Sequence, residues 1–287
     1  MKIGFFAVGI GNLSKPEILA AAAQEGEEAG FSTLWAAEHV VLLEKFESLY
    51  PYARTPSTPS EDLAILNPFV ALTYAAAVTK SIRLATGVCL VPEYNSLLLA
   101  KLASSLDFVS GGRFVFGTGL GWLKEEYEAL GVPWEGRARR YRESIEAMRR
   151  VWEDPTSSYA GESLSFSHVR AFPKPAHRIP VIMGGQADAA LKRAATYGDG
   201  WCGFNITPTE TKAHLATLDR FLAENGRTRE NFEIFVSPEQ TLSADCVQAY
   251  EDIGVDELYP AAAFGMSFAT LEEARTAIGS MGKQWVR

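Results

Sequence analysis

Residues 179–204, which read IPVIMGGQADAALKRAATYGDGWCGF, decide the fold of this chain. Residues 179–183 form a short apolar run that is typical of a strand, and the triplet Gly184-Gly185-Gln186 ends it. From Asp188 onward, apolar residues recur at helical spacing, and residues 201–204 have strand character again. Because two parallel strands need a crossover between them, this stretch predicts a strand, a helix and a second, parallel strand.

The turn between the first of these strands and the helix is suited to bind an anion. Paired glycines let the backbone approach a ligand closely, and the free N–H groups of a helix start, with the helix dipole, favour negative charge. Gly184, Gly185 and Gln186 are therefore candidate residues for binding the phosphate of a cofactor. The other interpretation is an ordinary helix cap in an α/β protein.

The bulk composition fits a globular protein with one large core. The chain has 287 residues, of which 47% are hydrophobic and 22% are charged, and α/β barrels commonly have this length as one domain. The net charge of −8 argues against nucleic acid or an anionic membrane surface as the main partner, because both need an excess of Lys and Arg. We expect a small-molecule substrate as the partner.

The cysteines and the N-terminus indicate the compartment. Cys89, Cys202 and Cys246 are widely spaced without a CxxC pattern, which argues against a disulfide framework and fits a reducing cytoplasm. Residues 3–8 are apolar, but no small-x-small cleavage site follows them, so we expect a first strand and not a secretory leader. No apolar stretch approaches the roughly 20 residues that span a bilayer, so we expect no membrane partner.

Short apolar runs alternate with longer helical patterns along the chain, which is the signature of a parallel α/β fold. The expected strands are residues 3–8, 33–37, 82–90, 113–117, 179–183, 201–204, 232–237 and 257–262. The expected helices are residues 18–29, 68–78, 97–109, 135–153, 188–197, 209–224, 245–253 and 270–281. This pattern predicts one (β/α)8 TIM barrel domain over residues 1–287.

Two connections are too long for simple turns. Residues 40–66 are rich in proline and tyrosine, and a loop of this length in a compact domain is usually a lid or a binding loop. Residues 154–174 alternate in the manner of a small hairpin. We expect both insertions to line or cover the C-terminal mouth of the barrel, where their aromatic side chains favour an apolar, planar substrate.

Glu38 and His39 follow the second expected strand directly, which places two ionisable side chains at the mouth. They are candidate site residues, because the C-terminal ends of the strands form the mouth of a barrel. The other interpretation is that His39 only hydrogen-bonds the loop that follows. The remaining histidines are scattered, so we expect no metal site. The sequence shows no activated lysine either, which argues against a barrel hydrolase or aldolase.

Residues 117–121 read GTGLG and follow the fourth expected strand. A GxGxG pattern suggests a dinucleotide site, but the match to the expected strand-helix unit with an acidic residue about 20 positions later is not clean, which disfavours a nicotinamide-binding fold. These glycines would instead let the backbone approach a flat ligand, so Gly119 is a candidate cofactor-binding residue. We interpret the arginines of residues 135–153 as a solvated helix face and not as a phosphate site.

Taken together and in this order, several motifs resemble those of the bacterial-luciferase-like family of flavin- and deazaflavin-dependent oxidoreductases. The resemblance covers essentially the whole chain. The matching motifs are the opening strand 3–8, Trp35-Ala36-Ala37-Glu38-His39, Leu84-Ala85-Thr86-Gly87-Val88, Ser110-Gly111-Gly112-Arg113 with Gly117-Thr118-Gly119, and Ile182-Met183-Gly184-Gly185 with Gly198-Asp199-Gly200-Trp201.

The resemblance implies where a cofactor would bind. It implies that the ring lies at the C-terminal mouth, backed by a bulge with a non-proline cis peptide that falls at Gly87-Val88. It also implies that the cofactor phosphate lies at Gly184-Gly185-Gln186, in agreement with the anion site expected from the residues themselves. A homodimer built on barrel helices is implied as well.

Family members that use coenzyme F420, a deazaflavin, often carry an acidic residue and a histidine where this chain has Glu38 and His39. The resemblance implies that these two are catalytic residues, with His39 at the reacting face of the ring or the substrate as a proton carrier. The resemblance therefore implies an F420-dependent oxidoreductase that transfers a hydride between the deazaflavin and a small organic substrate. Two alternatives stay open: an FMN-dependent monooxygenase of the same family, and a non-catalytic flavin-binding barrel. The sugar-phosphate dehydrogenases of the family carry a catalytic glutamate where this chain has Trp122, with Glu125 and Glu126 further on, which argues against a sugar-phosphate substrate.

Overall fold

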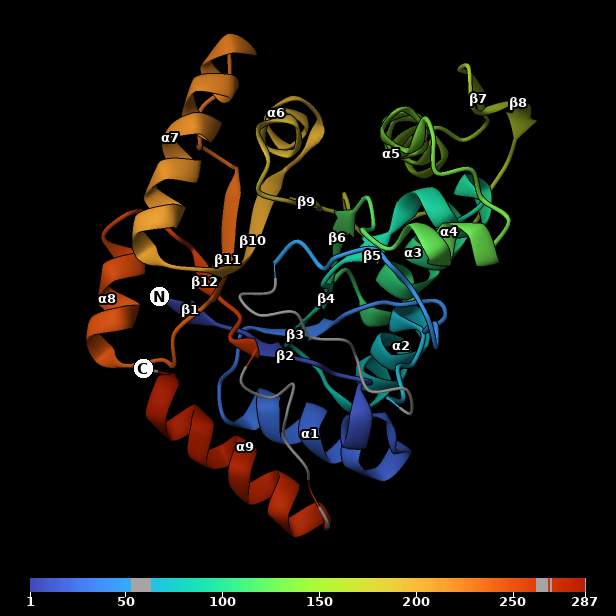
Figure 1. The fold of residues 1–287 in the computed structure, drawn as a ribbon. Helices are drawn as coiled ribbons and strands as arrows, with labels where there is room; N and C mark the ends of the chain where they lie inside the picture. Colours follow the sequence, from blue (N-terminus) through green and yellow to red (C-terminus); the bar gives the residue numbers. More distant parts are fainter. Residues whose placement is uncertain (53–62, 262–267, 269, 287) are drawn as a thin grey trace.

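The computed structural model describes residues 1–52, 63–261, 268 and 270–286. Its central feature is a sheet whose neighbouring strands all run parallel and close into a barrel (Figure 1). The strands are β1 (Lys2–Ile3), β2 (Phe5–Phe6), β3 (Thr33–Ala36), β4 (Arg83–Thr86), β5 (Cys89–Leu90), β6 (Phe114–Gly119), β9 (Val181–Gly184), β10 (Gly200–Ile206), β11 (Glu233–Pro238) and β12 (Glu257–Leu258). The predicted (β/α)8 barrel is confirmed.

Closure of the barrel depends on the first strand, which is split at Gly4 into β1 and β2. The first half pairs with β12, with Lys2 opposite Glu257, and the second half pairs with β3, with Phe5 opposite Leu34. The two halves together therefore join the last strand of the barrel to the second and leave no free edge at this point.

Helices surround this sheet and run antiparallel to the strands that they connect. Sequence signals start and stop several of them: Asn67 and Asn95 cap two helices through their side chains, Thr207 and Glu210 form a capping box, and Gly111 with φ +72° ends one in the left-handed region. The barrel helices are α1 (Pro16–Glu28), α2 (Pro68–Val78), α3 (Ser96–Ser110), α5 (Arg137–Glu153), α6 (Asp188–Tyr197), α7 (Pro208–Glu224), α8 (Ala244–Glu251) and α9 (Leu271–Trp285). None of the helices in the described ranges has the length and apolar character that a membrane crossing requires.

Two predicted strands differ from the observed ones. The stretch 82–90 is not one strand, because the cis peptide Gly87–Val88 separates β4 from β5. The fourth strand runs on to Gly119, so Gly117 and Gly119 lie inside β6 and not in a loop after it. A side chain at Gly117 would overlap the carbonyl oxygen of Thr86, and one at Gly119 would lie 2.6 Å from Val88 Cγ2. These glycines are therefore explained by close packing against the neighbouring strand.

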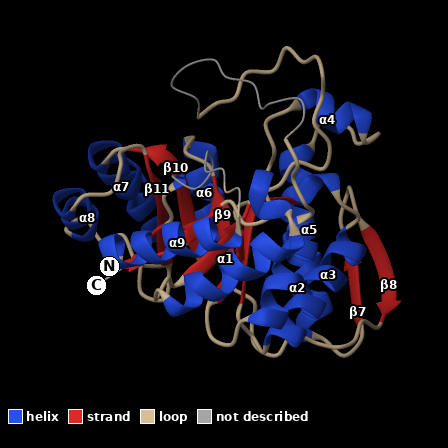
Figure 2. Cartoon of the chain, turned by 90° about the horizontal axis from the view of Figure 1, so that it is seen from below, coloured by secondary structure: helices blue, strands red, loops and turns tan. Residues whose placement is uncertain are grey.

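The predicted hairpin is present as β7 (Ser157–Ala160) and β8 (Ser165–Val169), which pair antiparallel. It does not cover the mouth, so that part of the expectation is wrong. The hairpin connects the end of α5 to the start of β9 and packs along the flank of α5, where the Tyr159 hydroxyl donates to Glu146 Oε2 over 2.6 Å (Figure 2). The segment that does follow a strand at the mouth is residues 120–136, which contains the unpredicted helix α4 (Lys124–Ala129).

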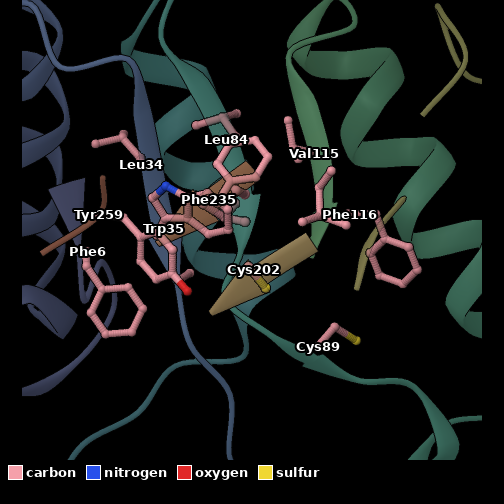
Figure 3. Close-up of a cluster of buried hydrophobic side chains, with 14 of the residues drawn as sticks. Phe6, Leu34, Trp35, Leu84, Cys89, Val115, Phe116, Cys202, Phe235 and Tyr259 are labelled. Atoms are coloured by element: carbon pink, nitrogen blue, oxygen red, sulfur yellow. The ribbon is translucent and has the colours of Figure 1, made fainter. Parts of the chain in front are cut away.

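The core of the barrel holds aromatic side chains from neighbouring strands, namely Phe6 from β2, Trp35 from β3, Phe235 from β11 and Tyr259 directly after β12. Figure 3 shows Trp35, Tyr259, Phe235 and Phe6 side by side, with the Trp35 and Tyr259 rings stacked 4.6 Å apart. Phe235 meets Trp35 edge-on at 5.2 Å. Because these rings fill the interior, the barrel is a packed core and not a channel.

Below these rings, at the floor of the barrel, the buried carboxylate of Glu257 has a full set of partners. It accepts hydrogen bonds of 2.8 Å each from Ser32 Oγ, Thr33 Oγ1 and Trp35 Nε1. A side chain at Gly4 would lie 2.6 Å from Glu257 Oε1 and 2.7 Å from Trp35 Nε1. Glycine at position 4 therefore leaves the space that this hydrogen bond occupies.

Candidate functional site

The cis peptide brings together four of the predicted cofactor-binding residues. Val88, which follows the cis bond to Gly87, points its side chain between the ends of β6 and β9. Ideal Cβ atoms placed on Gly119 and Gly184 would lie 2.6 Å and 3.2 Å from the Val88 methyl groups. The absence of side chains at these two glycines leaves room for the Val88 side chain. The predicted position of the cis peptide at Gly87–Val88 is confirmed.

The turn after β9 has the backbone conformation that the paired glycines suggested. Gly185 has φ +119°, and a side chain there would lie 2.7 Å from Ala190 Cβ and 3.8 Å from the Tyr52 hydroxyl. The carbonyl oxygen of Gly185 accepts from Trp201 Nε1 at 2.7 Å. Gln186 uses its side-chain amide to donate to the Phe204 carbonyl at 2.6 Å. The turn is therefore held rigidly at the start of α6, although binding of a phosphate there stays a prediction.

Positive charge lies close to this turn. Burial lowers the pKa of Arg193 on α6, and its guanidinium carbon lies 6.0 Å from the centre of the Tyr141 ring. Arg137, at the start of α5, stacks 3.5 Å from the centre of the Trp134 ring, and its buried Nε atom has no hydrogen-bond partner among the residues described. The basic run of α5 is thus not a uniformly solvated face, because its first turn is partly buried at the mouth. The sequence pattern could not separate these arginines from the exposed ones.

Glu38, a predicted catalytic residue, is buried behind the bulge. Only 6% of it is exposed, and burial raises the pKa of its carboxyl group. It accepts hydrogen bonds from the Leu90 N–H at 2.7 Å and from the Tyr94 hydroxyl. Glu38 therefore holds the segment that follows the cis peptide, and a direct role in chemistry remains a prediction.

His39 lies nearer to solvent than Glu38 and has a partner that the sequence did not reveal. Its Nδ1 is 2.8 Å from Oε2 of Glu126, which is fully buried on α4, and its side chain is 17% exposed. The edge of its ring meets Trp122 at 5.9 Å between ring centres. His39 and Glu126 are 87 positions apart, so no spacing rule could have joined them. The only signal was an acidic pair at the start of a helix after a strand.

Aromatic side chains of residues 40–52, the first part of the loop after β3, lie between His39 and the turn at Gly184-Gly185. Trp122 contacts Phe46 at 5.9 Å and Tyr50 at 5.2 Å between ring centres. Tyr50 meets Tyr52 at 5.5 Å, and Tyr52 meets Phe204 at 6.4 Å. The expectation that this insertion covers the mouth is confirmed for residues 40–52, whereas residues 53–62 lie outside the described ranges. An aromatic cover of this kind excludes water and favours apolar substrate surface.

One further carboxyl group at the mouth was missed. Both oxygens of Glu93, in the 3₁₀ turn Val91–Glu93, are buried, and no hydrogen-bond partner for them lies among the described residues. Burial, and after it the charges of Glu126 and Glu38, raise the pKa of Glu93 to about 9. Glu93 is therefore protonated at neutral pH. Among the described residues, no group of His, Cys, Asp and Glu side chains is arranged to hold a metal ion.

Comparison with known sequences identifies the class of protein that this fold and mouth define. Residues 6–280 match the family of luciferase-like monooxygenases, so the chain belongs to that family and is an enzyme. A protein of Mycobacterium tuberculosis without an assigned function is 38% identical over 185 residues, which make up 63% of this chain and 66% of that protein. The 5,10-methylenetetrahydromethanopterin reductase of Archaeoglobus fulgidus is 30% identical over 62% of this chain and 53% of its own length.

Solved structures show the same fold with two kinds of cofactor. The coenzyme F420-dependent tetrahydromethanopterin reductase of Methanopyrus kandleri superposes with a TM-score of 0.74 at 16% identity, over 97% of this chain and 98% of that one. An FMN complex of the oxygenating component of 3,6-diketocamphane monooxygenase from Pseudomonas putida superposes with a TM-score of 0.63 at 17% identity, over 83% and 67%. Related proteins thus include F420-dependent reductases and flavin-dependent monooxygenases.

Proposed function

We propose that this chain is an F420-dependent oxidoreductase that transfers a hydride between the deazaflavin and a small organic substrate. The observation that carries the proposal is the position of His39, at the end of β3 beside the strand β4 that leads into the cis bulge. A hydride that leaves an alcohol carbon requires a proton to leave the attached oxygen. A histidine at this place is suited to accept that proton.

The residues at the mouth fit such a cofactor. The glycine at position 185 leaves a cradle that a side chain would fill, and Arg193 supplies positive charge beside it. Gly185, the start of α6 and Arg193 would hold the phosphate, with Tyr52 above them. The bound deazaflavin would supply the site that accepts or donates the hydride.

The chain itself contributes three things to the reaction. The aromatic loop that contains Tyr50 and Tyr52 excludes water from the mouth. The rigid ends of β3 and β6 orient the substrate against the bulge. They hold the substrate and the cofactor in the geometry that hydride transfer needs. His39 holds or moves the proton that accompanies the hydride.

The proposal is tested by binding F420 and FMN separately to the purified protein, followed by fluorescence. Gly185→Asp places a bulky negative side chain in the cradle, where an ideal Cβ already lies 2.7 Å from Ala190 Cβ. Gly226→Asp is a matched control, because Gly226 also has a positive φ of +66° but nothing lies within 4 Å of its ideal Cβ. We expect tighter binding of F420 than of FMN, lost in Gly185→Asp and kept in Gly226→Asp.

The other outcomes are equally informative. Tighter binding of FMN than of F420 would favour an FMN-dependent monooxygenase, as found among the related proteins. Binding of neither cofactor by the folded wild-type protein would overturn the proposal.

A further inference from the structure

The side-chain carboxylate of Glu126 hydrogen-bonds three consecutive residues of the opposite loop. Its Oε2 lies 2.8 Å from His39 Nδ1, and its Oε1 accepts from the N–H groups of Val40 at 2.6 Å and Val41 at 3.1 Å. Glu126 itself is 0% exposed. Both oxygens are therefore occupied, and the carboxylate has one fixed orientation relative to the histidine ring.

That orientation decides which ring nitrogen of His39 carries the proton. An ionised carboxylate can only accept hydrogen bonds, so Nδ1 must be the donor. In the neutral ring, Nε2 is then left as an acceptor. Among the described residues, no partner of Nε2 is found, and the ring remains partly open to the mouth.

The other polar groups around His39 do not compete for Nδ1. The carboxyl group of Glu38 is turned to Leu90 and Tyr94, and the hydroxyl of Tyr127 donates to the Leu120 carbonyl. Glu93 is protonated at neutral pH because burial raises its pKa to about 9. Trp122 presents its ring and not a charge to His39. Glu126 is thus the group that faces the histidine nitrogen.

Glu125, the neighbouring residue on α4, provides a natural comparison. Its Oε1 accepts from the N–H groups of Glu47 at 2.8 Å and Ser48 at 3.1 Å, which belong to the same loop. Each of the two glutamates therefore fastens the loop to α4 through a pair of backbone N–H groups. Only Glu126 also contacts the histidine ring.

We propose that Glu126 is the positioning residue of the active site: it fixes His39 as the Nδ1–H tautomer, so that Nε2 faces the substrate as a proton acceptor. The same carboxylate also holds the backbone of Val40 and Val41, directly after the histidine. The inference rests on the proposed role of His39 as the proton carrier. Glu126 acts through His39 and does not itself contact the reacting atoms.

The test is nitrogen-15 NMR of the full protein labelled at histidine, without cofactor, at a pH where the ring is neutral. His39→Asn identifies the signals of His39. In the wild type we expect a protonated Nδ1 and an unprotonated Nε2. In Glu126→Gln the side-chain amide can donate as well as accept, so we expect the Nε2–H tautomer to gain population. In Glu125→Gln, which loosens the same loop, we expect the wild-type pattern.

A predominant Nε2–H tautomer in the wild type, or equal changes in the two glutamine variants, would overturn the inference. If Glu126→Gln does not fold, the wild-type spectrum still decides. Binding of F420 to the same samples, followed by fluorescence, tests the proposed function separately. Loss of all F420 binding with an intact Nδ1–H tautomer would contradict the function but not the positioning of His39.

Discussion

At the floor of the barrel the buried carboxylate of Glu257 meets three donors, whereas at the mouth the buried oxygens of Glu93 meet none within the part of the chain that the structure describes. Both side chains are acidic, and both lie next to strands of the same sheet. The difference is the number of hydrogen bonds that the surroundings supply. A buried carboxyl group without hydrogen-bond partners lowers the stability of the folded protein. Such a residue is kept where it is selected for function and not for stability.

The same contrast extends to the basic residues. At the floor, Arg83 forms two hydrogen bonds of 2.9 Å and 2.8 Å with the carboxylate of Glu233. At the mouth, the buried Nε atoms of Arg137 and Arg140 find no partner in residues 1–52, 63–261, 268 and 270–286. We therefore expect that removal of an ionisable group at the floor destabilises the folded protein, whereas removal of one at the mouth stabilises it.

The largest effect is expected for Glu257→Ala at the floor. The change leaves the donors of Ser32, Thr33 and Trp35 unpaired in the core, which should lower the free energy of unfolding by about 3–5 kcal/mol. Urea unfolding followed by tryptophan fluorescence measures the loss. Glu257→Gln, which keeps the volume and one acceptor oxygen, should cost less. A loss below about 1 kcal/mol for the alanine variant would remove the distinction between floor and mouth.

Much of the fold could be predicted from sequence, because strand and helix positions follow from periodicity and caps. The expected helix 68–78 coincides with α2 (Pro68–Val78), since Asn67 and Pro68 mark its start. The site could be predicted only where one segment carries the whole signal, as at Gly184 and Gly185. The partnership of His39 with Glu126 joins segments that only the closed barrel brings together. Periodicity cannot reveal a contact of that kind.

The second effect has the opposite sign and concerns Glu93→Gln at the mouth. Burial raises the pKa of Glu93 to about 9 from its ordinary 4.5, so the unfolded chain loses this proton at lower pH than the folded one. The wild type therefore loses stability as pH rises from about 4.5 to about 9, and the glutamine variant does not. After allowance for solvent screening, we expect Glu93→Gln to be more stable by about 1–2 kcal/mol at pH 9.

Thermal unfolding at several pH values measures this difference. The midpoints of wild type and Glu93→Gln should coincide near pH 4.5 and separate as the pH increases. Glu44→Gln, at an exposed position of the neighbouring loop, is the control and should follow the wild type. A Glu93→Gln protein that is less stable than the wild type at pH 9 would show that the carboxylate has a partner in solution.

The smallest effect is expected for Glu27→Gln, at the end of α1 beside the loop that enters β4. Its carboxylate accepts from the N–H groups of Lys80, Ser81 and Ile82 and from the Ser81 hydroxyl. Burial alone would raise the pKa of Glu27, but these hydrogen bonds together lower it to about 2. The stabilisation is thus fully present above about pH 4.5 and is lost as the pH falls towards 2.

Glu27→Gln keeps one acceptor oxygen, so we expect a loss of about 1 kcal/mol at pH 7. Urea unfolding at pH 7 and pH 3 measures it, with Glu28→Gln, at the exposed adjacent position, as the control. The loss should shrink at pH 3, because Glu27 of the unfolded chain, with its ordinary pKa of 4.5, is then protonated and must release that proton on folding. This is the reverse of the trend expected for Glu93, since hydrogen bonds lower one pKa and burial without partners raises the other. If Glu27→Gln and Glu93→Gln both gained stability relative to the wild type as the pH rises, burial and not hydrogen bonding would determine the pKa of the carboxyl group at both ends of the barrel.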